Sequence, residues 1–172
     1  MGTGGGPVRP LLFLDVDGPL IPFGGPALDG PLEQEDPVAA VNPLLTRIDP
    51  SVGHRLAVLC YELVWATTWG EDANECIAPR IGLPSLPVVP WPEPSAEEER
   101  DTRAGRHWKT RTLVAQAAGR PFSWVDDEIT LADREWVAAH HDGPALLHRV
   151  DPRFGLGPDD FLLLEQWAVS LG

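Results

Sequence analysis

The sequence predicts an α/β protein in which a mainly parallel, five-stranded sheet lies between two layers of helices, as in Rossmann-like folds. Short apolar segments of strand type alternate with longer segments of helical type, a pattern typical of a parallel sheet with helices on both faces. Polar residues directly follow several strand segments, at the place where open α/β sheets bind ligands. A length of 172 residues suffices for one domain with a sizeable core.

Five segments have the composition of strands, because each is a short apolar run beside turn-forming or polar residues. In chain order they are residues 11–16, 62–67, 86–90, 122–125 and 145–150. We expect Trp65 and Trp124 to lie in or near the core, on opposite sides of the central strand.

Helices are predicted between the strands from apolar spacing and from end signals. Ser51 and Thr130 are residue types that cap helix N-termini, and Gly82 and Gly119 suit helix C-termini. The predicted helices, the first of them short, span residues 39–48, 51–60, 72–81, 107–118, 130–140 and 158–171.

Three segments are predicted to be irregular. Residues 1–10 are expected to form a flexible tail, which leaves a single domain over residues 11–172. Residues 19–37 are rich in proline and glycine and are expected to form a loop with at most one helical turn. Residues 91–105 combine proline with an acidic run, which predicts a mobile loop with solvated charges.

The overall charge narrows the classes of partner. A net charge of −13 and an isoelectric point of about 4.6 disfavour long nucleic acid, whose binding depends on Lys and Arg contacts to phosphates. A small phosphorylated substrate stays compatible, because one local cation can reverse the local field. Cys60 and Cys76 are expected to be reduced and outside any zinc site. Without a membrane-length apolar run or a signal peptide, the sequence predicts a cytoplasmic protein with no membrane partner.

The most informative stretch is residues 11–18, Leu-Leu-Phe-Leu-Asp-Val-Asp-Gly, where a predicted strand ends in two carboxylates. Side chains alternate across a strand, so Asp15 and Asp17 are expected to converge on one site while Val16 points away. Crowded carboxylates need a cation or a shared proton, and their oxygens suit Mg²⁺. The alternative is an ordinary strand followed by an acidic turn.

Three further motifs stand at strand ends or at a helix start. The second strand ends in Ala-Thr-Thr-Trp, Lys109 lies at the start of a predicted helix, and the fourth strand runs into Asp-Asp-Glu. Each motif has a structural alternative. Threonines favour strands, arginines near Lys109 could serve in its place, and acids are favoured at helix N-termini.

Together with Asp-Val-Asp-Gly, these motifs resemble the four ordered motifs of the haloacid dehalogenase-like (HAD) superfamily, over nearly the whole chain. Trp-Ala-Thr-Thr-Trp, His-Trp-Lys-Thr and Trp-Val-Asp-Asp-Glu are most similar to the HAD-type domain of Swiss Army Knife RNA repair proteins and of actinobacterial hypothetical proteins. The resemblance implies a Mg²⁺-dependent phosphatase that hydrolyses a phosphate monoester through an aspartyl-phosphate.

The resemblance also implies roles for the acidic residues. Asp15 would be the nucleophile, because a carboxylate can divide one hard step into two easier ones. Asp17 would protonate the leaving oxygen and then deprotonate water, and its backbone carbonyl would be a metal ligand. Mg²⁺ would be held by Asp15 together with Asp126 or Asp127.

The remaining roles that the resemblance implies concern the phosphoryl group. Lys109 would supply a cation near Asp15, and the hydroxyl of Thr67 would donate to phosphoryl oxygens, with Thr68 as the alternative. The residues expected to contact substrate are Gly18, Thr68 and Trp69.

Proteins of the HAD superfamily often take their specificity from a cap inserted after the first motif or between the second and third motifs. Here residues 18–61 and 69–108, which separate these motifs, are largely filled by ordinary fold elements and leave room for only a minimal cap. Residues 21–36 and 91–105 are the candidates for a lid. An open site admits a nucleotide or nucleic-acid end, a phosphoprotein or a phosphorylated natural product. Two alternatives stay open: a non-catalytic HAD-like module that binds a phosphorylated ligand or a protein, and another HAD chemistry such as dehalogenation. The acid at Asp17 favours phosphate chemistry over dehalogenation.

Overall fold

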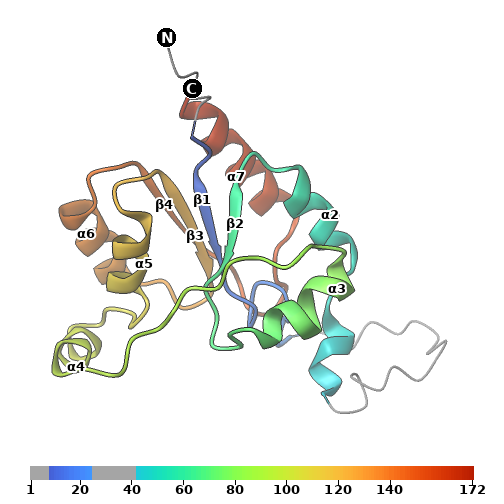
Figure 1. Cartoon of the computed structure of the whole chain (residues 1–172), viewed down its shortest axis with the longest axis horizontal. Helices are drawn as coiled ribbons and strands as arrows, with labels where there is room; N and C mark the ends of the chain where they lie inside the picture. The colour runs from blue at the N-terminus through green and yellow to red at the C-terminus, as the bar shows by residue number, and fades with distance from the viewer. Residues whose placement is uncertain (1–7, 25–41) are drawn as a thin grey trace, which may run out of the picture.

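A parallel sheet forms the centre of the molecule in the computed structural model, which describes residues 8–24 and 42–172 (Figure 1). Within these residues the sheet has four strands in the order β2-β1-β3-β4, and neighbouring strands run parallel. Leu14 pairs with Trp65 of β2 and with Val125 of β3, so these three strands end at one edge. The strands are β1 (Leu11–Leu14), β2 (Glu62–Trp65), β3 (Phe122–Asp126) and β4 (Ala145–Arg149).

The predicted fifth strand, residues 86–90, is reduced to a single parallel bridge between Trp65 and Val88. The Trp65 N–H donates to the Pro87 carbonyl at 2.8 Å, and the Val89 N–H donates back to the Trp65 carbonyl at 2.9 Å. Pro87 and Pro90 lack N–H groups, so the segment cannot continue the ladder.

Helices cover both faces of the sheet, as the alternation of segments predicts. Figure 1 shows α5 and α6 on one side and α2, α3 and α7 on the other. The helices are α2 (Ser51–Val58), α3 (Ala78–Ile81), α4 (Ala96–Arg103), α5 (Thr110–Ala117), α6 (Leu131–His140) and α7 (Pro158–Ser170), with a 3₁₀ helix η1 (Pro43–Arg47) and a π-helical turn η2 (Ala73–Ile77).

Alternation along β1 divides the apolar side chains between two cores. Leu12 and Leu14 belong to the core beneath α2, α3 and α7. Leu11 and Phe13 belong to the core beneath α5 and α6. Trp65 and Trp124 are fully buried, on the two strands that flank β1, as expected.

The acidic segment 91–105 differs from the expected mobile loop, because it contains α4. The Ser95 hydroxyl caps this helix by accepting from the Glu98 N–H at 3.2 Å. Acidic residues in the first turn interact favourably with the helix dipole. Asp101 is buried and pairs with Arg111 of α5, which ties the segment to that helix. The acidic run therefore belongs to a docked helix.

Helix ends differ from the sequence expectations in several places; α5 begins at Thr110 and not at residue 107, and α2 ends at Val58 and not at residue 60. Ser51 is the first residue of α2 and not its cap, since the Asp49 side chain accepts from the Ser51 N–H at 2.8 Å. The helix expected over residues 72–81 is divided into η2 and α3, and Gly82 ends it in the left-handed region as expected. Ala118 with φ 48° ends α5, one residue before the predicted Gly119.

Some predictions fall wholly or partly outside the described residues. These are the N-terminal tail, the lid candidate over residues 21–36 and the start of the helix over residues 39–48. The described end of that last segment is the 3₁₀ helix η1. Cys60 and Cys76 are free thiols, as predicted. None of the described helices combines the length and the apolar composition needed to cross a membrane.

Candidate active site

Polar side chains from three strands and one helix start meet in a cleft at the carboxyl edge of the sheet. Asp15 directly follows β1, Asp126 ends β3, and Lys109 directly precedes α5. Since side chains alternate, Asp15 shares a face with Phe13, and Asp126 shares that face with Trp124. This face is the one covered by α5, so the lysine and both carboxylates meet. A cleft of about 170 Å³ is lined by Asp15, Asp17, Phe23, Thr68, Trp108, Lys109, Asp127 and Glu128.

One ammonium group is shared by two buried carboxylates at the base of this cleft. Lys109 Nζ lies 3.0 Å from Asp15 Oδ2 and 2.8 Å from Asp126 Oδ2. The three side chains are 4%, 10% and 0% exposed, respectively. Burial opposes the charge on Lys109, but the two carboxylates outweigh it and raise the pKa of the lysine. Lys109 is therefore a permanent cation at the cleft.

Burial disfavours the charged form of Asp15. Its Oδ1 accepts from the Val16 N–H at 2.8 Å and its Oδ2 from Lys109. Burial raises the pKa of Asp15 to about 7, against the opposing effect of Lys109 and with the added repulsion of Asp126. Near neutral pH an additional cation would therefore stabilise the charged form of Asp15.

Asp126 and Asp127 are adjacent in sequence but have different surroundings. Asp126 is fully buried; its Oδ1 accepts from the Glu128 N–H at 3.0 Å and its Oδ2 from the Trp124 indole at 3.3 Å. Asp127 is partly exposed and lines the cleft. Burial and the nearby Asp126 charge raise the pKa of Asp127. Both motif acids therefore reach the site, one at its base and one at its wall.

Gly18 determines how closely Asp127 can approach. Gly18 has φ +91°, and a Cβ at this position would lie 2.7 Å from the Asp127 Cγ. A side chain there would be strained and would also displace the Asp127 carboxylate. This glycine, predicted as a substrate contact, has a clear structural role in positioning Asp127.

Asp17 lines the same cleft as Asp15, which agrees with the expected convergence of the two acids. The Trp69 indole N–H donates to Asp17 Oδ2 at 3.1 Å. Trp69, predicted as a substrate contact, is absent from the cleft lining and instead orients Asp17.

The two threonines of the second motif are separated by burial. Thr67 is fully buried, its hydroxyl accepts from the Trp69 N–H at 3.3 Å, and its carbonyl accepts from the Trp91 indole at 3.0 Å. Thr68 is exposed and lines the cleft. Thr68 is thus the threonine that faces the cleft, whereas Thr67 stabilises the turn.

Lys109 is oriented by a hydrogen-bond network centred on Asp133 of α6. Asp133 Oδ1 accepts from the His107 N–H at 2.7 Å and from the Thr110 hydroxyl at 2.6 Å. Its Oδ2 accepts from the N–H and the hydroxyl of Thr130, at 2.8 and 2.9 Å, in a capping box. The residues on both sides of Lys109 are therefore anchored to the next helix.

Three carboxylates could hold a divalent cation beside Asp15. Oxygens of Asp15, Asp126 and Asp127 all lie within 4.8 Å of one another. Opposite ligands of an octahedral Mg²⁺ ion are about 4.2 Å apart, so small side-chain movements suffice. The all-oxygen donor set and the raised pKa values of Asp15 and Asp127 fit such an ion. The Asp17 carboxylate is outside this trio.

A second group of possible ligands consists of His107, Asp126 and Glu128. His107 Nδ1 accepts from the Lys109 N–H at 3.1 Å. The opposite ring nitrogen of this histidine, 3.2 Å from Glu128 Oε2, is then the protonated one and donates to that carboxylate. The geometry gives His107 the role of holding Glu128 at the cleft.

Sequence reasoning missed one residue of the cleft and left two others open. Phe23 was not predicted individually, although it lies in the segment 21–36 that is a candidate lid; its aromatic character beside the first motif was the available signal. For Trp108 a place at the border of the site, and for Glu128 a role in orienting the metal ligands, were open alternatives to structural roles. All three line the cleft.

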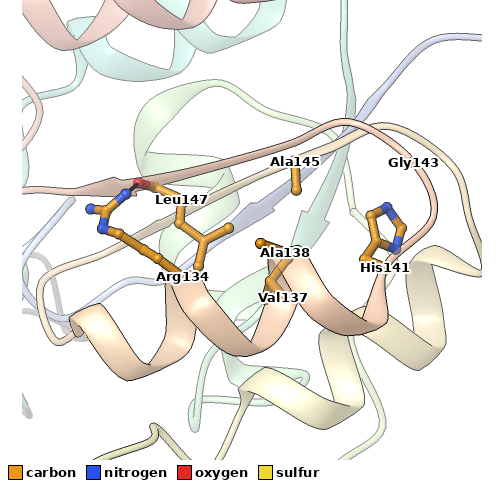
Figure 2. A pocket seen from close by; sticks show the side chains of 7 residues that line it. All are labelled: Arg134, Val137, Ala138, His141, Gly143, Ala145 and Leu147. Atoms are coloured by element: carbon orange, nitrogen blue, oxygen red, sulfur yellow. Dashed lines mark hydrogen bonds between the residues drawn. The ribbon is translucent and has the colours of Figure 1, made fainter.

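A separate hollow lies between α6 and β4, away from the motif residues (Figure 2). It is lined mainly by apolar side chains, and Figure 2 shows Arg134 reaching the Leu147 carbonyl on the edge strand. Its lining includes neither a carboxylate nor a lysine. The chemistry of the described residues is therefore concentrated in the cleft at the carboxyl edge.

Comparisons with protein-family models, with curated proteins and with solved structures find no match to this chain.

Proposed function

We propose that the protein is a Mg²⁺-dependent phosphatase of HAD type, which hydrolyses a phosphate monoester through an aspartyl-phosphate on Asp15. The observation that carries this proposal is the cluster of Asp15, Lys109 and Asp126, with Asp127 completing a carboxylate trio beside an open cleft. Such a cluster combines a nucleophile, a fixed cation and an oxygen donor set for a metal ion.

Binding of the phosphoryl group depends first on charge. Four carboxylates and one ammonium line the cleft, so a dianionic phosphate is repelled unless a cation joins it. Asp15, Asp126 and Asp127 would hold Mg²⁺, which neutralises the phosphate and increases the electrophilicity of phosphorus. Lys109 stabilises the charge that develops on phosphoryl oxygens, and the exposed Thr68 is placed to donate to one of them.

The first chemical step transfers the phosphoryl group to Asp15. A carboxylate oxygen of Asp15 forms a bond to phosphorus while the bond from phosphorus to the leaving oxygen breaks. Asp17 gives a proton to that oxygen, so the product leaves as a neutral alcohol. The Trp69 indole N–H holds the Asp17 carboxylate in position for this transfer.

The second step releases inorganic phosphate. Asp17, now ionised, removes a proton from a water molecule that attacks phosphorus, and the bond between phosphorus and Asp15 breaks. Asp15 and Asp17 return to their starting states, so protons and electrons balance over the cycle.

The proposal is tested by hydrolysis of an aryl phosphate with and without Mg²⁺. The wild-type protein is compared with Asp15→Asn and with Asp142→Asn, which changes an exposed aspartate. We expect Mg²⁺-dependent turnover that falls by at least about a thousandfold in Asp15→Asn and is unchanged in the control.

A negative result is interpreted with a wider set of substrates. No turnover of nucleotides, sugar phosphates and phosphorylated RNA ends, together with no detectable Mg²⁺ binding, would contradict the proposal. That outcome would favour a non-catalytic module that binds a phosphorylated ligand or a protein.

A further inference from the structure

The rim of the cleft contains aromatic side chains next to the charged residues. Phe23 and Trp108 both line the cleft, together with Lys109 and four carboxylates. Phe23 is 53% exposed, although exposure of a large apolar ring to water is unfavourable. Ligand sites commonly combine such apolar walls with a few polar groups that fix orientation.

Trp108 is held rigidly close to the reactive groups. Its ring makes an edge contact with Trp91 at a centroid distance of 4.7 Å and stacks on His107 at 5.6 Å. Lys109 Nζ lies 5.7 Å from the centroid of the same ring. A small substrate can therefore place one group against the Trp108 ring and its phosphoryl group beside Lys109 at the same time.

Phe23 is fixed through its backbone while its ring stays accessible. Its N–H donates to the Pro152 carbonyl at 2.7 Å, and its carbonyl accepts from Arg47 at 3.2 Å. An anchored residue with an exposed ring loses little conformational entropy when a ligand packs against it.

The charge of the cleft limits what else the substrate can carry. Lys109 is the one cation among the lining residues, and it is already shared by Asp15 and Asp126. The lining carboxylates, which include Asp17, Asp127 and Glu128, outnumber it by three. With Asp17 protonated, as the proposed first step requires, the three other lining carboxylates and the buried Asp126 still outweigh Lys109 and one divalent cation by one charge, so a second phosphate on the substrate is disfavoured.

We propose that the site takes an aryl phosphate: a single phosphate on a flat, uncharged aromatic ring that packs against Phe23 and Trp108. This substrate class rests on the proposed phosphatase function for its chemistry, whereas the ring-binding walls can be tested by binding alone. The charge of the cleft disfavours diphosphates and triphosphates relative to a single phosphate.

The test measures calorimetric binding of phenylphosphonate and ethylphosphonate in the presence of Mg²⁺. The measurement is made at alkaline pH, where both probes are dianions; neither is hydrolysed, and they differ in the ring. We expect phenylphosphonate to bind the wild-type protein about tenfold more tightly, the size of a single aromatic contact. Phe23→Leu and Trp108→Leu should each reduce this preference to about twofold.

A matched control is Phe154→Leu, which removes a ring that is 75% exposed and outside the cleft lining. It should keep the full preference for phenylphosphonate. Equal affinity of the wild-type protein for both probes, or binding of neither, would overturn the proposal. Phe23→Leu alone suffices if Trp108→Leu fails to fold, since Phe23 is half-exposed.

The outcomes separate this inference from the proposed function. Efficient hydrolysis of alkyl phosphates without any ring preference would keep the phosphatase and overturn the aryl class. A ring preference in binding without turnover of any phosphate ester would overturn the phosphatase and keep the ring-binding walls. Competition between phenylphosphonate and a phosphotyrosine peptide distinguishes a free aryl phosphate from one carried on a polypeptide, and either source supports the aryl class.

Discussion

Two regions of this molecule bury carboxylates, and they do so in different ways. At the junction of α5 and α6, the fully buried Asp133 accepts four hydrogen bonds from backbone N–H and hydroxyl groups. At the base of the cleft, Asp15 and Asp126 share one lysine, and Asp127 lies beside them. The junction satisfies one charge with several neutral donors, whereas the cleft crowds several charges around one cation.

The comparison separates an acid that stabilises the fold from acids to which the proposed function gives a chemical role. A carboxylate with all its oxygens bonded and two helix N-termini nearby has little need of a further partner. Crowded carboxylates with one shared cation are costly to keep ionised, and they become favourable when a metal ion or a substrate arrives. The two regions are also connected, because Asp133 anchors the residues on both sides of Lys109.

The largest expected change in stability comes from Asp133→Ala, which removes the carboxylate that joins α5 to α6. The His107 and Thr130 N–H groups and the Thr110 hydroxyl would lose their acceptor in a buried site. We expect the free energy of unfolding to fall by about 3 kcal/mol and the melting temperature by about 6–12 °C. Urea and thermal denaturation measure both. Asp142→Ala at an exposed site is the control, and equal stability of the two variants would show that the junction is unimportant.

An intermediate effect concerns pH and the cleft acid Asp15. Its pKa of about 7 in the folded protein lies above the ordinary 3.8. The unfolded chain therefore loses this proton first, and without metal the stabilisation from the protonated carboxyl is lost as the pH rises from about 4 to 7. The wild-type protein should lose on the order of 2 kcal/mol relative to Asp15→Asn over this range.

Urea unfolding at several pH values, with and without Mg²⁺, measures this difference. Added Mg²⁺ should restore stability to the wild-type protein near neutral pH and do less for Asp15→Asn. Parallel stability curves for the two proteins across the range would contradict a raised pKa of Asp15.

The smallest expected change in stability comes from Asp127→Asn, which removes one of the crowded charges of the cleft. This charge lies on a partly exposed wall, where solvent screens much of the repulsion. We expect the metal-free protein at pH 8 to be stabilised by about 0.5 kcal/mol, which is 1–2 °C in melting temperature. The same variant should lose most of the stabilisation by Mg²⁺. Destabilisation of the metal-free variant would place Asp127 with the structural acids.

Local patterns in the sequence account for much of the fold and of the candidate site. The strands β1, β2, β3 and β4 fall within or close to their expected ranges, because short apolar runs beside polar residues are strong signals. Thr130 caps α6 as predicted, with a capping box that its own neighbour Asp133 completes. Asp15, Asp17, Lys109 and the acid pair after β3 meet because parallel strand ends share one edge.

Other features depended on interactions that no local pattern contains. The acidic run of residues 97–99 is part of α4, because Ser95 caps this helix and the buried Asp101 forms an ion pair with Arg111 of α5. The segment 86–90 was apolar enough for a strand, but its prolines limit pairing to one bridge. The two threonines after β2 are adjacent and identical in type, so only their surroundings assign Thr67 to the turn and Thr68 to the cleft.

The alternation of strands and helices, the parallel sheet and the set of acids at its carboxyl edge could all be predicted from local sequence patterns. Those features follow from hydrophobic periodicity and chain direction, which act within a few residues. The tertiary structure decided that Asp133 anchors the turn before α5, that Gly18 admits Asp127, and that Phe23 and Trp108 form walls of the cleft. These contacts join residues far apart in the chain, so their energies depend on burial and distance that only the folded molecule defines.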